Sequence, residues 1–290
     1  MSFVDMPAAE VEIDAELVGR LLEAQCPELA GRPLSLVANG WDNTIFRLGD
    51  DLCVRLPRRQ VAVQLIRNEN RWLPLLASRV SVPVPAPVYV GEPGEGFAWP
   101  WSVCRWIEGV VASEVPPPQR RSLAPGLGAF FRALHVPAPS DAPRNPVRGV
   151  ALSERSPAFY ERLHAVPDAS ELTAMWEELV AVPQWQGPPV WVHGDPHPAN
   201  ILIGQSGLAG VLDFGDLTAG DPATDLAAGW FVFDEPGRRS FREHLGDIDD
   251  DTWERARGWA LNIGTAIVAH TDDNPRMAQV GRHVLEQLLV

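Results

Sequence analysis

The stretch WVHGDPHPANILI (191–203) decides which fold we expect. Asp195 and Asn200 stand in it between two apolar runs, and the prolines on either side of His197 prevent a continuous helix. We therefore expect a tight loop that carries both polar side chains between short strands. The expected strands are 190–193, 200–203 and 208–213.

A third polar residue, Asp213, follows the next apolar run in VLDFGD (211–216). A hairpin between those two strands would bring the Asp195 loop and the Asp213 turn side by side. Two carboxylates and an amide oxygen around one point are ligands that Mg²⁺ prefers, together with waters and phosphates. One carboxylate can then orient and deprotonate a hydroxyl, which is the layout of phosphoryl transfer. An Asp and an Asn on a loop can also merely cap the backbone, but Asp213 at this distance favours the catalytic interpretation.

These segments resemble the catalytic and metal-binding segments of aminoglycoside phosphotransferase-like kinases, which share the protein-kinase fold. The resemblance implies that Asp195 is the catalytic base and that Asn200 and Asp213 bind Mg²⁺. It also implies that Asp225, in GDPATDLA (220–227), braces the catalytic loop from a helix.

The resemblance implies an α+β, bilobal fold. A small antiparallel β-sheet lobe with a helix, including the hinge, would span 1–108, and a larger, mainly helical catalytic lobe would span 109–290. The apolar pattern agrees, with strands expected at 34–38, 44–48 and 52–56, a strand near 87–91 and another ending at Gly109. A helix at 60–79, kinked or split by Pro74, should follow the third strand, and later helices are expected at 119–135, at 170–181 and after Ala223.

The chain contains no lysine, because all 24 basic residues are arginine. Kinases use a lysine on the third strand to grip the α- and β-phosphates, and a glutamate on the next helix holds it. In LCVRLPRR (52–59) Arg55 occupies the lysine position, and Glu69 is the expected partner. Arginine can hold two phosphate oxygens, and VRLPRR resembles the corresponding stretch of macrolide kinases. The alternative is that both residues are plain surface charges.

Two further segments are candidates for nucleotide binding. In ANGWDNTIF (38–46), Gly40 and the backbone N–H groups of the next turn residues could line phosphates, although an ordinary hairpin turn explains the pattern equally well. The residues concerned are Gly40, Asp42, Asn43 and Thr44. VCRWIEG (103–109) resembles the hinge, where Cys104 would guard the pocket and the backbone of Arg105 and Ile107 would bind adenine or guanine. Either ATP or GTP fits this expectation.

A metallohydrolase is the second interpretation of the opening stretch, because His193 and His197 stand four residues apart. Helical zinc motifs need that spacing on one helical face, and the glycine and prolines here prevent a helix. We expect His193 to hydrogen-bond inside the loop and His197 to do likewise or to approach substrate.

Composition narrows the partners. The net charge of −14 disfavours nucleic acid, and no apolar stretch is long enough to span a membrane. The acidic N-terminus lacks the apolar segment of a signal peptide, and three scattered cysteines form neither a disulfide framework nor a zinc site. A cytoplasmic protein is expected.

The acceptor should bind after Asp225, where acidic and aromatic residues accumulate. The acidic residues would attract a cationic aminoglycoside or form a solvated surface. The aromatic residues would line a pocket for a macrolide or form core. The acidic set is Asp234, Glu235, Glu243, Asp247, Asp249, Asp250, Asp251 and Glu254, and the aromatic set is Trp230, Phe231, Phe233, Trp253 and Trp259.

The expected function is transfer of the γ-phosphate of ATP or GTP to a hydroxyl of an aminoglycoside-like or other hydroxylated small molecule, with Mg²⁺ as cofactor. A macrolide-type antibiotic kinase and a catalytically silent, nucleotide-binding relative remain alternatives. The oligomeric state and a role in antibiotic resistance are left open by the sequence.

Overall fold

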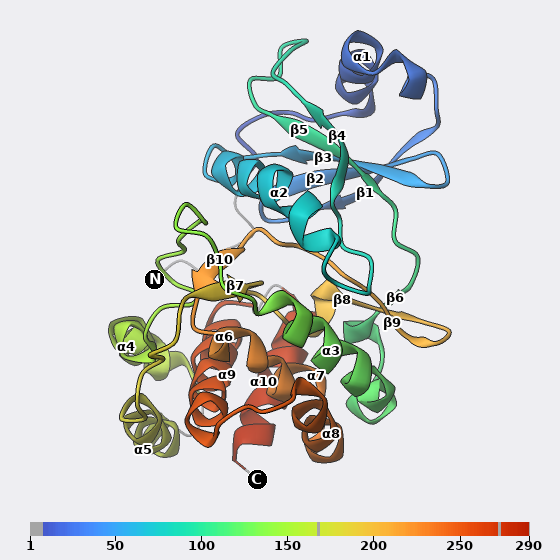
Figure 1. Ribbon diagram of the computed structural model, residues 1–290. Coiled ribbons are helices and arrows are strands. Elements are labelled where there is room, and N and C mark those ends of the chain that lie inside the picture. Colours follow the sequence, from blue (N-terminus) through green and yellow to red (C-terminus); the bar gives the residue numbers. More distant parts are fainter. Residues whose placement is uncertain (1–7, 167–168, 272–273, 290) are drawn as a thin grey trace. The chain divides into compact units, whose positions relative to one another are not determined.

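The computed structural model describes residues 8–166, 169–271 and 274–289 (Figure 1). The chain divides into two compact units. The N-terminal unit contains the described residues up to Glu108 together with Asp213–Gly215, and the C-terminal unit contains Gly109–Leu212 and the chain from Asp216 onward. The predicted fold class, an antiparallel sheet with a helix followed by a mainly helical part, is confirmed.

The N-terminal unit is built on a five-stranded antiparallel sheet with the strand order β1-β2-β3-β5-β4. Short turns join the first three strands as the sequence predicts, and Gly49 has the left-handed φ of +59° that the second turn requires. The strands are β1 (Leu34–Asn39), β2 (Asn43–Leu48), β3 (Leu52–Pro57), β4 (Pro87–Gly91) and β5 (Trp101–Arg105).

Strand β3 is buried along its whole length because both faces of the sheet are covered. Leu52, Val54 and Leu56 belong to the hydrophobic core that also contains the buried side of helix α1 (Ala15–Gln25). Alternate residues of a strand point to opposite faces, so Arg55 lies on the other face, where it meets helix α2 (Ala62–Ala77). The strand period therefore places a charged side chain inside this unit.

Two predicted boundaries were wrong, and the predicted split of the helix at Pro74 does not occur. Helix α2 continues through Pro74, whose ring is exposed while Trp72, Leu73 and Leu76 are buried and hold the last turn against the unit. The fifth strand ends at Arg105 rather than at Gly109. The helix expected from 119 is a 3₁₀ segment at Pro117–Leu123 that becomes α3 at Ala124–Leu134, because the prolines before it favour a tighter turn.

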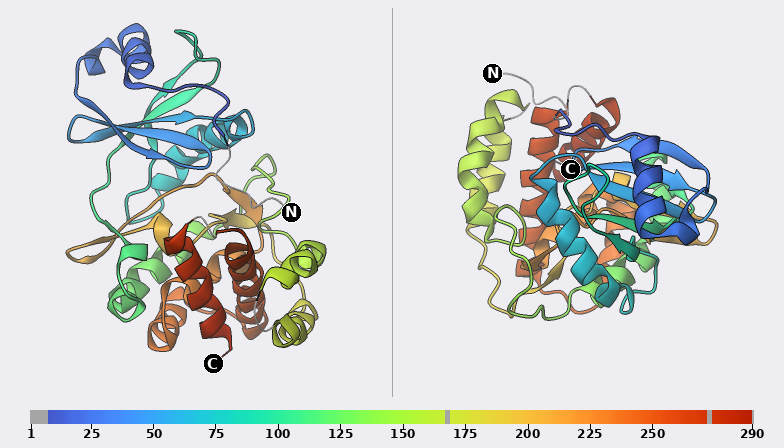
Figure 2. Two further views of the ribbon diagram at one scale, coloured as in Figure 1. Left: turned by 180° about the vertical axis from the view of Figure 1, so that it is seen from behind. Right: turned by 90° about the horizontal axis from the view of Figure 1, so that it is seen from above.

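Helix α9 (Asp250–His270) is the central element of the C-terminal unit. It packs against α10 (Pro275–Leu288), and Figure 2 shows the two helices side by side. Shorter helices cover it further, and α3 packs separately against α8 (Glu235–Leu245). The covering helices are α4 (Ser156–Arg162), α5 (Ala169–Val180), α6 (Ala223–Leu226) and α7 (Ala228–Val232).

Two small β-ladders hold the loop that carries Asp195. Strand β7 (Val190–Val192) pairs with β10 (Thr218–Gly220), and β8 (Ile201–Gly204) pairs with β9 (Gly207–Val211) and with β6 (Val110–Val111). The hairpin predicted from the sequence is confirmed, since Ile201 lies opposite Val211. Among the residues described, no helix is long and apolar enough to cross a membrane.

Candidate active site

The loop from His193 to Asn200 is fixed by its glycine and prolines. Gly194 has a φ of +91°, and a Cβ at this position would lie 2.5 Å from the carbonyl oxygen of Asp216. A side chain here would therefore both strain the backbone and clash. Pro198 opens a 3₁₀ turn that ends at Asn200. The loop is the tight, non-helical connection that the sequence predicts.

Asp225 of α6 braces this loop, as predicted. Its fully buried carboxylate accepts hydrogen bonds from the backbone N–H groups of His193 and Gly194, at 2.8 and 2.9 Å, and pairs with Nε2 of His135 at 2.9 Å. The His193 ring ties the loop to Leu212, the residue after β9, because its Nδ1 accepts the amide of Asp195 and its Nε2 contacts the carbonyl oxygen of Leu212 at 2.9 Å. The position of Asp195 is thus set by Asp225 of α6 and by the His193 ring, which is held at Leu212.

The two carboxylate oxygens of Asp195 have different surroundings. Oδ2 lies 3.2 Å from Nε2 of His197 and 3.4 Å from Nδ2 of Asn200. Oδ1 receives no hydrogen bond from any residue in the described ranges, and the side chain is 27% exposed. One oxygen is therefore held, and the other is open to a ligand.

Asp195 is an ionised carboxylate at neutral pH. Burial alone would raise its pKa, but His197, through its hydrogen bond and its charge when protonated, and then Arg148 and His193, hold that pKa well below its usual range. Such a group accepts a hydrogen bond from a hydroxyl readily and takes the proton only late in the reaction. That suits phosphoryl transfer, in which positioning contributes more than strong basicity.

Asn200 is oriented to offer its oxygen. Its Nδ2 donates to the carbonyl oxygen of Asp195 at 3.0 Å, so the amide oxygen points elsewhere, and none of the described side chains or N–H groups donates to it. An amide oxygen of this kind suits Mg²⁺. In the described chain no three His, Cys, Asp or Glu side chains gather as a metal cage.

Arg148 is a contributor to this site that the sequence did not reveal. Its Nε donates to the carbonyl oxygen of Gly194 at 2.7 Å and lies 3.4 Å from Asp216 Oδ2, while Asn145 holds the other oxygen of Asp216 at 2.8 Å. The residue stands in a proline-rich segment that reads as a plain surface loop. Only the tertiary contact with Gly194 identifies it.

In the N-terminal unit, Arg55 and Glu69 form the predicted pair. The Arg55 Nη2 to Glu69 Oε1 distance is 3.0 Å and both side chains are buried. Burial opposes the charge of Arg55, but Glu69 raises its pKa above the ordinary value, so the guanidinium stays charged. The same Oε1 accepts the amide of Phe214 at 3.2 Å, and Oε2 is buried without a hydrogen-bond partner. The interpretation as plain surface charges is excluded.

Asp213 directly precedes Phe214, whose amide donates to Glu69. Burial raises the pKa of Glu69, and the charge of Asp213 raises it further. The φ of Asp213 is +57°, a left-handed conformation that is uncommon outside glycine, and its Oδ1 accepts the amide of Gly215 at 3.3 Å. A residue kept in such a conformation is a candidate for function. Leu212, the preceding residue, donates its amide to the carbonyl oxygen of Asn200 at 2.8 Å.

The turn at Gly40–Thr44 joins β1 to β2 and is held by two arginines that follow β3. Arg58 donates to the carbonyl oxygen of Gly40 at 2.8 Å, and Arg59 pairs with the carboxylate of Asp42 at 2.6 Å. Thr44 is buried, and its hydroxyl donates to Asn39 Oδ1 at 3.0 Å. The turn is well braced, and its binding of phosphate stays a prediction.

The predicted hinge residues lie at the end of β5. Cys104 is buried, Arg105 is the exposed last residue of the strand, and Ile107 is half-buried beyond it. Arg47 stacks over the ring of Trp106 at 4.0 Å, and the amide of Trp106 donates to Asp51 at 2.8 Å. Base recognition by this segment stays a prediction.

The helical zinc interpretation of His193 and His197 is not supported, because neither residue lies on a helix and both ring nitrogens of each take part in contacts within the loop and its neighbours. The His193 ring contacts Asp195 and Leu212, and the His197 ring contacts Asp195 and Ala199. The prediction that His193 hydrogen-bonds inside the loop is confirmed.

Most of the acidic residues expected near the acceptor cap helices or form ion pairs. Asp234 caps α8 and pairs with Arg121, and Asp249 caps α9 by accepting the amide of Thr252 at 2.7 Å. Glu235, Asp250 and Glu254 form ion pairs with nearby arginines. The five aromatic residues proposed as a pocket are all buried in the helical core. The aromatic residues therefore form core, and binding of the acceptor by the acidic residues stays a prediction.

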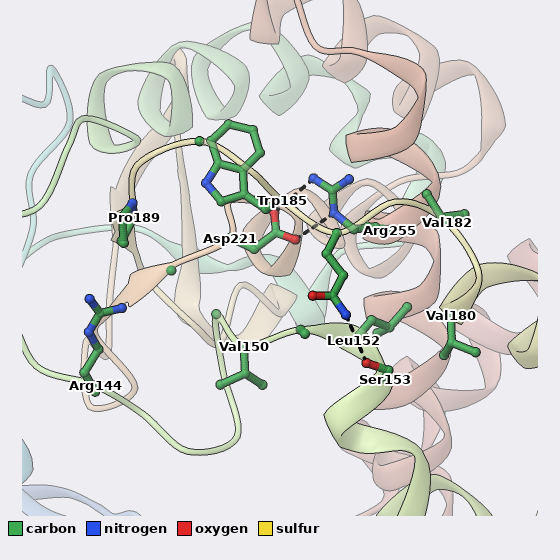
Figure 3. Close-up of a pocket in the computed structure, with 15 residues that line it drawn as sticks. Arg144, Val150, Leu152, Ser153, Val180, Val182, Trp185, Pro189, Asp221 and Arg255 are labelled. Carbon is green, nitrogen blue, oxygen red and sulfur yellow. Dashed lines mark hydrogen bonds and ion pairs between the residues drawn. The ribbon is translucent and has the colours of Figure 1, made fainter.

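A cavity of about 240 Å³ lies elsewhere in the C-terminal unit (Figure 3). Apolar residues form much of its wall, among them Val150, Val182 and the Trp185 indole. Of its charged members, Asp221 and Arg255 are paired with each other at 2.7 Å, and Arg144 donates to the carbonyl oxygen of Ala219 at 3.0 Å. Asp195 and Asn200 do not line this cavity, and we do not count it as part of the site.

The sequence matches one family model, described as the phosphotransferase enzyme family, over residues 33–259. Among curated proteins, none matches the chain.

Solved structures with a similar fold carry related names. The GDP and kanamycin complex of APH(2")-IIia has a TM-score of 0.73 and 21% identity, covering 93% of this chain and 97% of that one. The streptomycin-ATP-APH(2")-IIa ternary complex has a TM-score of 0.61 and 18% identity, with coverages of 95% and 97%. Macrolide 2'-phosphotransferase type I has a TM-score of 0.64 and 18% identity, with coverages of 96% and 99%. At these identities the similarity establishes the fold.

Proposed function

The chain belongs to the phosphotransferase enzyme family, and we propose that it transfers the γ-phosphate of ATP or GTP to a hydroxyl of a small molecule. The observation that carries the proposal is the state of Asp195. Its carboxylate is ionised, one oxygen is held by His197 and Asn200, and the other is open.

Asp195 is the proposed catalytic base. Its open oxygen would accept a hydrogen bond from the acceptor hydroxyl, orient the attacking oxygen and take up the proton as the new bond to phosphorus forms. The brace from Asp225 and the contacts of Arg148 with Gly194 fix the loop in advance. Positioning of this kind is the main contribution a protein makes to phosphoryl transfer.

Asn200 and Asp213 are the proposed ligands of Mg²⁺. Their oxygens fit a hard cation, and the left-handed backbone of Asp213 and the oriented amide of Asn200 support the assignment. The bound ion would neutralise charge on the phosphate oxygens.

Arg55 is proposed to hold the α- and β-phosphates, with Glu69 keeping its guanidinium in place. The turn at Gly40, Asp42, Asn43 and Thr44 and the segment at Cys104, Arg105 and Ile107 complete the proposed nucleotide site. The names of structurally similar proteins include GDP and ATP complexes, which supports a nucleotide donor without favouring one base.

The proposed acceptor is an aminoglycoside-like or other hydroxylated small molecule, since similar folds bear the names of kanamycin and streptomycin complexes and of a macrolide phosphotransferase. A role in antibiotic resistance would follow from either antibiotic class. The three cysteines are free thiols, which fits a reducing compartment, and we extend the proposal to a cytoplasmic location.

The test measures Mg²⁺-dependent consumption of ATP and of GTP against aminoglycosides, macrolides, sugars and amino alcohols. We expect acceptor-dependent turnover that vanishes in Asp195→Ala and on chelation of Mg²⁺. The substitution should lower kcat by about 10²- to 10⁴-fold, the usual contribution of a general base, while Mg²⁺–nucleotide affinity stays nearly unchanged. Equal turnover in wild type and Asp195→Ala would contradict the assignment. Nucleotide binding without turnover for any acceptor would favour a silent relative.

A further inference from the structure

Two ring contacts of His197 with described residues need different nitrogens: one must accept a hydrogen bond and the other can donate one. Its Nδ1 accepts the backbone N–H of Ala199 at 3.2 Å, and its Nε2 lies 3.2 Å from Oδ2 of Asp195. The ring is well covered, with 14% of the side chain exposed. One side of the ring therefore serves the backbone of the loop, and the other faces the carboxylate proposed as the base.

These contacts fix the position of the ring proton. A nitrogen that accepts an N–H carries no proton of its own, so Nδ1 is the acceptor nitrogen of a neutral imidazole. The remaining proton is then on Nε2, directed at Asp195 Oδ2. His197 can thus donate to the carboxylate while it stays neutral.

The other groups around Asp195 do not supply this contact. Asn200 Nδ2 is further from Oδ2, at 3.4 Å, and makes its shorter bond of 3.0 Å to the backbone oxygen of Asp195. Arg148 donates to Gly194, and His193 accepts the amide of Asp195. Without His197, the carboxylate would be freer to rotate about its Cβ–Cγ bond and exchange its two oxygens.

We propose that His197 positions the catalytic carboxylate: its Nε2–H holds Oδ2 of Asp195, so that Oδ1 alone meets the acceptor hydroxyl. This inference rests on the proposed phosphotransferase function. As the acceptor oxygen bonds to the γ-phosphorus, the bond from that phosphorus to the bridging oxygen breaks and the nucleoside diphosphate leaves with the electron pair. The hydroxyl proton passes to Oδ1, and His197 neither gains nor loses a proton.

The alternative role for His197 is purely structural, through its bond to Ala199. Two substitutions separate the roles. In His197→Gln the side-chain nitrogen can reach the position of Nε2 and still donate to Asp195. In His197→Asn the side-chain oxygen can reach the position of Nδ1 and still accept the Ala199 amide, but no donor reaches Asp195.

We expect His197→Asn to lower kcat by about 10- to 100-fold, the effect of losing one hydrogen bond to a charged group, with KM for nucleotide and acceptor changed less than about 2-fold. His197→Gln should recover most of that loss. The same order should hold for Mg²⁺-dependent nucleotide hydrolysis with water as acceptor, which needs no identified substrate. Equal kcat in Asn and wild type, or a Gln variant slower than Asn, would overturn the proposal in favour of the structural role.

A ring-nitrogen NMR spectrum of His197 tests the hydrogen bond without any turnover. The signal, assigned by its loss in His197→Gln, should show the neutral form with the proton on Nε2. A proton on Nδ1 would overturn the proposal even if the enzyme is active. Conversely, an enzyme inactive with every acceptor and with water, yet showing the Nε2–H form, would contradict the proposed function and leave the Asp195–His197 contact intact.

Discussion

Arg55 shows how one residue is constrained by its surroundings. In a chain without lysine it carries the cation on β3, and Glu69 is its buried counter-charge. A buried ion pair adds little stability by itself, but the loss of one partner leaves an uncompensated charge in the interior. A lysine would keep the charge and lose the planar fork that can hold two phosphate oxygens.

We therefore predict a graded response at Arg55. Arg55→Ala should lower the free energy of unfolding by about 3–5 kcal/mol, because Glu69 is left buried alone, and should weaken nucleotide binding strongly. Arg55→Lys should retain more of the unfolding free energy and more of the nucleotide affinity than Arg55→Ala does. Urea unfolding and nucleotide titration measure the two effects. Arg32→Ala is the matched control, since its pair with Asp51 is exposed and contributes about 0–1 kcal/mol. Equal nucleotide affinity in Arg55→Ala and Arg55→Lys would remove Arg55 from the site.

The short helix α6 stabilises the Asp195 loop through the side chain of Asp225. Asp225 accepts hydrogen bonds from two backbone N–H groups of the loop that carries Asp195, one at each carboxylate oxygen, and contacts His135 of the segment after α3. These groups are buried, so each N–H needs its acceptor. The loop keeps its shape because Asp225 of α6 accepts the hydrogen bonds of its buried N–H groups.

Asp225→Asn tests this brace. An amide has one oxygen, so one buried N–H loses its acceptor, which costs about 1–3 kcal/mol of unfolding free energy, and kcat should fall as the loop loosens. Asp249→Asn is the control, because asparagine caps helices about as well as aspartate, and its effect should stay below about 0.5 kcal/mol. Thermal and urea unfolding with turnover assays measure both. An Asp225→Asn protein as stable and active as wild type would show that the brace is dispensable.

Elements were predictable where neighbouring residues, such as turn formers and prolines, determine the local structure. The β1–β2 and β2–β3 hairpins follow from turn residues between apolar runs, and the loop of Asp195 follows from its prolines. Helix α4 escaped prediction because tertiary contacts hold it: Phe159 stacks on Trp176 at 4.2 Å, and Arg162 donates to Thr265 of α9 at 3.0 Å. Arg148 escaped for the same reason. The sequence predicts that His197 bonds inside the loop or approaches substrate, but a spacing in sequence does not reveal that Asp195 is its partner.

The residues proposed to take part in phosphoryl transfer come from both compact units. Asp195 and Asn200 belong to the C-terminal unit, whereas Arg55, Glu69 and Asp213 belong to the N-terminal unit. The net charge of −14 favours a cationic small molecule over an anionic polymer as a partner. The chain belongs to the phosphotransferase enzyme family, and the proposed acceptor is a hydroxylated small molecule.

The most direct measurement follows the phosphoryl group itself. ATP and GTP labelled at the γ-phosphate are incubated with Mg²⁺, the protein and each hydroxylated acceptor, and the acceptor is separated and examined for label and for the mass of one added phosphoryl group. We expect label on an acceptor hydroxyl with wild-type protein and none with Asp195→Ala. Label that appears only as inorganic phosphate, at the same rate in both proteins, would contradict this expectation.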